Sequence, residues 1–265
     1  MHDDAAGARS ASPARAVALA CLWVSGLGVA VLLYLAAASL MAILAVRVGA
    51  DLLDGIDPLL DLARRPSLGP ARLATRELAV DILRQVFLAA LVLGAVIWRE
   101  PAQWRRRLAL DRAAPNGMRA RNLLLLLLLW PIVHIAWVSG TAEAFGAAFG
   151  RGVYLSPSLS PAAVTAWLAY LVVLAPAAEE ILMRGEIFAS ARRFLSPAAT
   201  ILVTAALFAL AHISAWGLAR PVSLLPLALM LGWLRWRTGR LWPCIALHGW
   251  SNLSLVAYVL WPSPG

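Results

Sequence analysis

Residues 162–185 read AAVTAWLAYLVVLAPAAEEILMRG, an apolar run that ends in two adjacent glutamates and an arginine. The chain carries no charged residue from Gly152 to Ala178, and a run of about 20 apolar residues is long enough to cross a bilayer as a helix. A charged group at membrane depth costs roughly 2.5–3.5 kcal/mol on insertion scales, so such groups mark functional sites by default. Glu179, Glu180 and Arg184 are therefore the first candidate site residues.

The composition of the whole chain is that of a membrane protein. Hydrophobic residues make up 62% of its 265 residues and charged residues only 14%, and its mean hydropathy is +0.77. Soluble domains are about 45–50% apolar and about 25% charged. The sequence therefore predicts an all-α fold, a polytopic helix bundle embedded in the bilayer.

Seven apolar segments are predicted to be transmembrane helices. They cover approximately residues 16–46, 78–98, 122–139, 162–183, 198–216, 222–236 and 241–261. Between the first two, residues 50–81 alternate leucine or isoleucine with aspartate and arginine, which predicts an interfacial amphipathic segment. We divide the chain into an N-terminal part, 1–150, which includes this segment and an arginine-rich loop, and a C-terminal helical domain, 151–265.

The distribution of arginine predicts the orientation. The chain has no lysine, and arginines gather in residues 99–121 and in the connections after the fourth and sixth segments. Cytoplasmic loops carry such an excess of positive charge. The sequence therefore predicts an integral membrane protein with a cytoplasmic N-terminus, and this lysine-free, alanine-rich composition is typical of a bacterial inner-membrane protein.

The formal net charge of +9 fits contact between these loops and anionic lipid headgroups. Nucleic-acid binding is not expected, because the arginines form no compact basic domain. The lipid bilayer is thus one predicted partner.

Helix geometry assigns different roles to the two glutamates. Glu180 and Arg184 are four residues apart, so on a helix they face each other and can form an ion pair. Glu179 is five residues from Arg184, about 140° around the helix. It is therefore the carboxylate left to act as a general base on water.

Two histidines and an asparagine downstream can complete a hydrolytic site. His212 follows Phe208 by one helical turn, and His248 and Asn252 share a face of the last segment. An imidazole and an amide side by side can donate hydrogen bonds to an oxyanion, or the imidazole can ligate a metal. A structural polar seam between helices is the alternative for His248 and Asn252. His134, beside Pro131, is interpreted as a satisfied structural group in an apolar helix.

Three motifs in this order resemble the CPBP family of membrane proteases. EEILMR at Glu179–Arg184 has the form EExxxR, FALAH at Phe208–His212 the form FxxxH, and HGWSN at His248–Asn252 the form HxxxN. The run TGRLWPCIALH before His248 is similar to the family's third motif region. The family includes CAAX prenyl endopeptidases of the Ras-converting type and bacteriocin-processing and self-immunity relatives. The resemblance covers residues 160–260, so 151–265 is predicted to be a CAAX-protease-like catalytic domain.

The resemblance implies an intramembrane endopeptidase. Glu179 would activate water together with His212, His248 and Asn252 would stabilise the oxyanion, and Glu180, Arg184 and Phe208 would support them. The substrate is expected to be a membrane-associated or lipidated peptide or protein.

Two alternatives stay open at this point. Glu179, His212 and His248 could instead ligate a divalent metal such as zinc, although we favour a metal-free site because a side-chain amide such as Asn252 is a poor zinc ligand. A non-catalytic scaffold, immunity or transport protein would keep the same polar residues for packing or passage.

Overall fold

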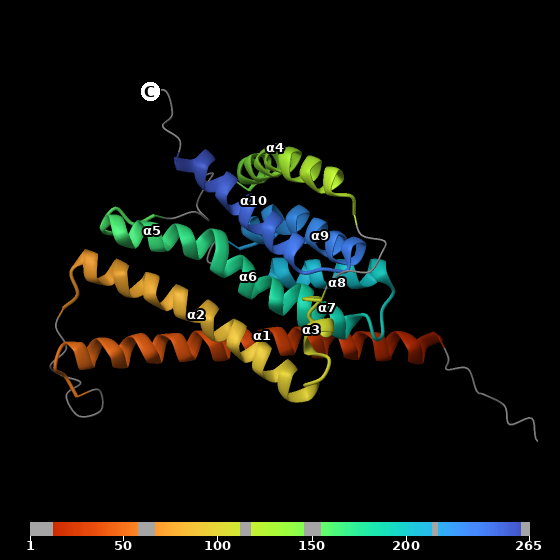
Figure 1. Cartoon of the computed structure of the whole chain (residues 1–265), viewed down its shortest axis with the longest axis horizontal. Coiled ribbons are helices and arrows are strands. Elements are labelled where there is room, and N and C mark those ends of the chain that lie inside the picture. The colour runs from red at the N-terminus through yellow and green to blue at the C-terminus, as the bar shows by residue number, and fades with distance from the viewer. Residues whose placement is uncertain (1–12, 58–66, 112–117, 146–154, 214–216, 261–265) are drawn as a thin grey trace, which may run out of the picture.

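The structure is a computed structural model that describes residues 13–57, 67–111, 118–145, 155–213 and 217–260. All regular elements in these ranges are helices (Figure 1). The predicted all-α, polytopic fold class is confirmed. The predicted domain boundary near residue 150 lies outside the described residues.

One long composite helix carries the two glutamates. It consists of α5 (Pro161–Ala169), η2 (Tyr170–Leu174), α6 (Ala175–Glu180), η3 (Ile181–Ile187) and α7 (Phe188–Ala191). The segments η2 and η3 are π-helical, so α6 lies between two stretches of wider turns. The other helices are α1 (Pro13–Leu53), α2 (Pro70–Arg99), α3 (Trp104–Arg107), α4 (Ala120–Ala144), α8 (Pro197–Leu210), α9 (Ala219–Thr238) and α10 (Trp242–Leu260).

Short sequence signals set several of these helix ends. Ser160 and Ser196 each cap a helix, because their side chains accept hydrogen bonds from the backbone amides of Ala163 and Ala199, and a proline follows each serine. This serine–proline pair is typical of a helix start. Gly239 ends α9 at φ 65°, a left-handed conformation in which glycine is favoured.

Each of the seven predicted segments contains a helix, and five of these helices are long and apolar enough to cross a membrane. The fifth and sixth segments differ from the prediction. Helix α8 has only 14 residues and ends at Leu210 rather than near residue 216. Helix α9 is long enough but has arginines near both ends, which lower its hydropathy.

The predicted interfacial segment at 50–81 overlaps the ends of two helices, and its position at the membrane surface stays a prediction. Its first residues complete α1, and residues 70–81 form the start of α2. The charges that suggested an interfacial position lie at the ends of these two helices, where Asp54 pairs with Arg72 and with Arg76. Residues 58–66, in the middle of the segment, lie outside the described residues.

The core joins both halves of the chain. Figure 1 shows α1 and α2 along one side, α4 on the opposite side, and α6, α8, α9 and α10 between them. Leu88 and Val92 of α2 belong to one buried apolar cluster with Ala178, Leu182 and Phe208. Helix α2 therefore packs directly behind the segment that carries the glutamates.

Candidate active site

The predicted ion pair between Glu180 and Arg184 is present, and it is fully buried. Nη1 of Arg184 lies 3.1 Å from Oε1 of Glu180, and both side chains have 0% exposure. Nη2 of Arg184 donates to the carbonyl oxygen of Ala228 at 2.8 Å, and the guanidinium lies 4.7 Å from the ring centroid of Phe208. The pair thus fixes α6 and η3 against α8 and α9.

Glu180 also orients His248, a contact that the sequence analysis did not predict. Nδ1 of His248 lies 2.9 Å from Oε1 of Glu180. Since a carboxylate accepts, this contact places the proton of a neutral imidazole on Nδ1 and leaves Nε2 as an acceptor. One carboxylate therefore holds both Arg184 and His248.

Both histidines approach the same carboxylate oxygen of Glu179. Nε2 of His212 and Nε2 of His248 each lie 3.9 Å from Oε2 of Glu179. Nδ1 of His212 lies 2.8 Å from the carbonyl oxygen of Phe208, so His212 too has its Nδ1 protonated and its Nε2 turned toward the glutamate. Three acceptor atoms from α6, α10 and the turn after α8 thus converge.

Accessibility separates the two glutamates. The side chain of Glu179 is 20% exposed and that of His212 is 21% exposed, whereas the side chain of Glu180 is completely buried. Glu179 is therefore the more accessible of the two carboxylates. The separate roles expected for the two glutamates stay a prediction.

His212 lies in a different local structure from the one expected. It follows the end of α8 by two residues, in a turn, rather than within a continuous helix. The hydrogen bond from Nδ1 to the Phe208 carbonyl still spans one turn, and the two rings lie 4.7 Å apart. The FxxxH spacing therefore lets the carbonyl and the ring of Phe208 fix the orientation of the His212 imidazole at the end of α8.

Asn252 is anchored to the composite helix. Its Nδ2 donates to the carbonyl oxygen of Leu171 at 2.9 Å, within the π-helical segment η2. A π turn shifts the backbone hydrogen-bond pattern, and the Asn252 amide binds a carbonyl of that segment. One N–H of the amide is used in this contact, and the second can face a ligand.

Gly249 allows α10 to approach η2 closely. A Cβ atom at this position would lie only 2.2 Å from the carbonyl oxygen of Val172. No side chain fits in that space, so the glycine of HGWSN is required for the contact between the two backbones. His248 and Asn252, on either side of it, are positioned by the same contact.

Gln85 is a site residue that the sequence analysis missed. It lies on α2 and is 5% exposed, and its Nε2 is 3.4 Å from Oε1 of Glu179. An amide inside the second predicted span, directly after Arg84, was the available signal. The N-terminal part of the chain thus contributes to the site.

A serine–histidine pair lies behind the site but is closed to substrate. Ser251 Oγ is 2.5 Å from Nδ1 of His134, and Trp130 donates to Ser251 at 3.1 Å. Ser251 and His134 are 0% and 1% exposed. This pair is a buried polar seam between α4 and α10, which agrees with our structural interpretation of His134.

The residues proposed as alternative metal ligands have suitable chemistry but not a metal-binding geometry. Glu179, His212 and His248 offer one carboxylate and two imidazoles whose Nδ1 atoms are bonded to acceptors, as zinc-bound histidines usually are. However, no group of three His, Cys, Asp or Glu side chains in the described ranges is arranged to hold a metal ion. We therefore derive no step through a metal.

Comparison with known families gives one match. Residues 160–254 match the family described as type II CAAX prenyl endopeptidase Rce1-like. This segment is thus similar to that family. It contains every motif residue of the site, from Glu179 to Asn252, and the family supports a membrane-embedded protease of the CAAX type. No curated protein and no solved structure matches the chain.

Proposed function

We propose that this protein is an intramembrane endopeptidase in which Glu179 activates water for attack on a peptide bond. The observation that carries the proposal is the convergence of two imidazole Nε2 atoms on one accessible carboxylate oxygen, each at 3.9 Å. The carboxylate of Glu179 and Nε2 of His212 are two fixed acceptors that suit a water molecule, because water can donate two hydrogen bonds. The family match of residues 160–254 supports the same activity.

The proposed reaction transfers one proton through Glu179. The carboxylate takes a proton from water while His212 orients that water through Nε2. The water oxygen bonds to the scissile carbonyl carbon, whose oxygen becomes an oxyanion. The carbon–nitrogen bond then breaks, and the proton on Glu179 passes to the leaving amine nitrogen, which gives a carboxylic acid and an amine.

Asn252 and His248 are proposed to stabilise the oxyanion. The second amide N–H of Asn252 is a donor, and its direction is fixed by the bond of the first N–H to Leu171. His248 is the second proposed donor: Oε1 of Glu180 lies 2.9 Å from its Nδ1 and fixes the ring, and its Nε2 donates when the ring is an imidazolium. Preorganised donors of this kind are typically worth about 10²–10³ in turnover each.

The substrate is proposed to be a membrane-associated or lipidated peptide or protein, cleaved within a bacterial inner membrane. Glu179 lies midway along a composite helix of 31 residues that is long enough to span a bilayer. A peptide bond must therefore be presented within or at the edge of the membrane to reach it.

The test is a cleavage screen with the purified full-length protein in detergent, using membrane-protein and lipidated-peptide substrates. Glu179→Gln should remove activity, because loss of a general base typically costs about 10²–10⁴ in rate. Glu143→Gln is the matched control, because Glu143 is exposed at the end of α4. Cleavage by Glu179→Gln equal to that by the unaltered protein would contradict the role proposed for Glu179, and no cleavage by either protein would favour a non-catalytic scaffold.

The metal-dependent alternative is tested in the same screen. Preparations are treated with a strong chelator, and their zinc content is measured alongside activity. In our proposal activity survives chelation. Stoichiometric zinc that is lost together with activity, and regained with it, would replace the glutamate mechanism by a metal-dependent one at the same residues.

A further inference from the structure

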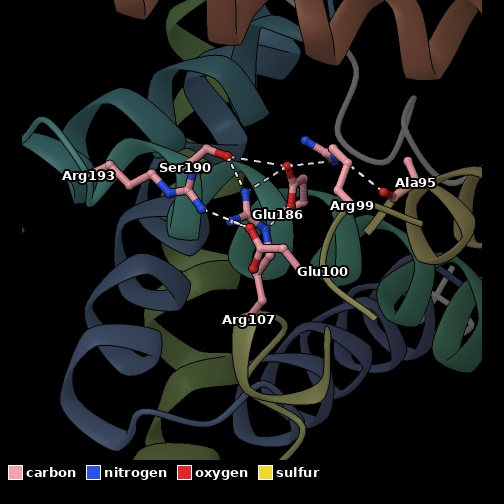
Figure 2. Close-up of polar contacts among 7 residues, drawn as sticks. All are labelled: Ala95, Arg99, Glu100, Arg107, Glu186, Ser190 and Arg193. Atoms are coloured by element: carbon pink, nitrogen blue, oxygen red, sulfur yellow. Dashed lines mark hydrogen bonds and ion pairs between the residues drawn. The ribbon is translucent and has the colours of Figure 1, made fainter. Parts of the chain in front are cut away.

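A cluster of paired charges lies at the arginine-rich end of the bundle (Figure 2). Glu186, on η3, accepts hydrogen bonds from Nε of Arg107 at 2.7 Å and from Nη2 of Arg99 at 3.0 Å. Glu100 accepts from Nη1 of Arg107 and from Nη2 of Arg193, both at 2.8 Å. The bond to Glu186 raises the pKa of Arg107, which therefore stays charged. Three arginines thus neutralise two carboxylates.

A pocket of about 420 Å³ opens beside this cluster and is electropositive. Arg106, Arg107, Arg192 and Arg235 line it, together with Glu100. These side chains come from α3, from the end of α7 and from the last turn of α9. Because Glu100 is already bound by two arginines, it does not offset the other positive charges.

Three of the lining arginines have no carboxylate partner among the residues that the structure describes: Arg106, Arg192 and Arg235. Two contacts hold the side chain of Arg235 in place. Its Nε donates to the carbonyl oxygen of Arg184 at 2.9 Å, and its guanidinium lies 5.3 Å from the ring centroid of Phe188. Arg192 uses one N–H on the carbonyl of its neighbour Leu195. Their remaining N–H groups can bind a ligand.

The chemistry of this pocket fits a phosphate group. Guanidinium groups bind phosphate oxygens through paired N–H donors. Trp236, also in the lining, is 49% exposed, and tryptophans of this kind lie at the level of the lipid headgroups. We propose that this pocket binds the phosphate group of an anionic phospholipid. A soluble phosphate shares the same chemistry and is distinguished by experiment.

The test measures lipid retention by the full-length protein. The delipidated protein is titrated with phosphatidylglycerol in detergent at constant ionic strength, and bound lipid is counted by native mass spectrometry. The variant Arg106→Gln/Arg192→Gln should bind phosphatidylglycerol about 25-fold more weakly, at roughly fivefold per arginine. Phosphatidylcholine, whose choline group cancels the charge of its phosphate, is titrated in parallel and should show a smaller difference between the two proteins.

The matched control is Arg105→Gln/Arg121→Gln, which removes two exposed arginines at the same end that do not line the pocket. It should retain phosphatidylglycerol as the unaltered protein does. An equal loss of phosphatidylglycerol affinity in the two double variants, or no loss of affinity in either, would overturn the proposal.

Inorganic phosphate is the second probe. If it binds the unaltered protein as tightly as phosphatidylglycerol does, and the pocket variant loses both, the site is assigned to soluble phosphate. Thermal unfolding of each variant checks that it is folded.

Discussion

Glu180 is the residue on which the site depends most, although it is not proposed to touch the substrate. Its Oε1 binds both Arg184 at 3.1 Å and His248 at 2.9 Å. A carboxylate with two such partners sets the position of an imidazole on another helix. The first glutamate of the pair is thus proposed to do the chemistry, and the second aligns the groups around it.

Loss of Arg184 should be costly for stability. Arg184→Ala leaves the buried carboxylate of Glu180 without its counter-charge, and breaking a buried pair in this way typically costs about 3–5 kcal/mol. The folded yield and the thermal unfolding temperature in detergent should both fall. Arg105→Ala, at an exposed position, is the control, and an equal effect of both substitutions would contradict the structural role of Arg184.

Gln85 should affect turnover more than stability. Gln85→Leu keeps a side chain of similar size in an apolar environment but removes the hydrogen bond to Glu179. Hydrogen bonds to charged groups are worth about 1.5–3 kcal/mol, so we expect turnover to fall about tenfold or more with little change in unfolding temperature. Steady-state kinetics on a cleaved peptide, at matched folded fraction, would show this. Unchanged turnover would remove Gln85 from the site.

At the scale of elements, the contact between α10 and η2 positions half of the site. Asn252 binds the Leu171 carbonyl, and Gly249 lets the two backbones meet. The sequence predicted the shared helix face of His248 and Asn252 from their spacing. It could not predict the partner of either residue, because His248 and Glu180 are 68 residues apart, Asn252 and Leu171 are 81 apart, and π-helical turns leave no periodic signal.

Gly249, which lies between His248 and Asn252, offers a direct test of the contact between α10 and η2. In Gly249→Ala the new Cβ would lie 2.2 Å from the Val172 carbonyl oxygen, so α10 must move away from η2. We expect a lower unfolding temperature and a loss of at least about 10²-fold in turnover, since small displacements of catalytic groups are costly. Gly94→Ala on α2 has no atom near its added Cβ. It should be neutral or slightly stabilising because alanine favours helix. Similar losses in both variants would contradict this interpretation.

At the scale of the whole molecule, the apolar runs of the sequence predicted most of the architecture. Each predicted apolar segment contains a helix. Such helices are predictable because a run of apolar residues can be recognised from a short stretch of sequence alone. Helix ends were less predictable where charges fall inside a helix, as at Asp81 and Arg84, which pair with each other at 2.8 Å on α2. Such a pair lowers the cost of charge near a membrane boundary.

The orientation of the bundle stays a prediction, and labelling can test it. We expect a cysteine at Arg105 to be protected from an impermeant reagent added outside intact cells, because residues 99–121 are predicted to be cytoplasmic. A cysteine at Phe145, the exposed end of α4, should react. The background is Cys21→Ser, and Cys244 can remain because it is buried. Labelling at Arg105 without labelling at Phe145 would reverse the topology.

The π-helical segments have a consequence for the comparison of related sequences. A π turn arises when one residue is added to an α-helix, and each residue turns an α-helix by about 100°. Deleting a single residue from Tyr170–Leu174 would therefore return this segment to an α-helix and leave the glutamates in phase with the rest of the helix. Deleting one from the regular α-helix Ala175–Glu180 would instead rotate the following residues by about 100°. In an alignment of relatives, a one-residue gap at Tyr170–Leu174 would mark the loss of a π turn, and a gap in α6 would mark a change in which carboxylate faces the histidines.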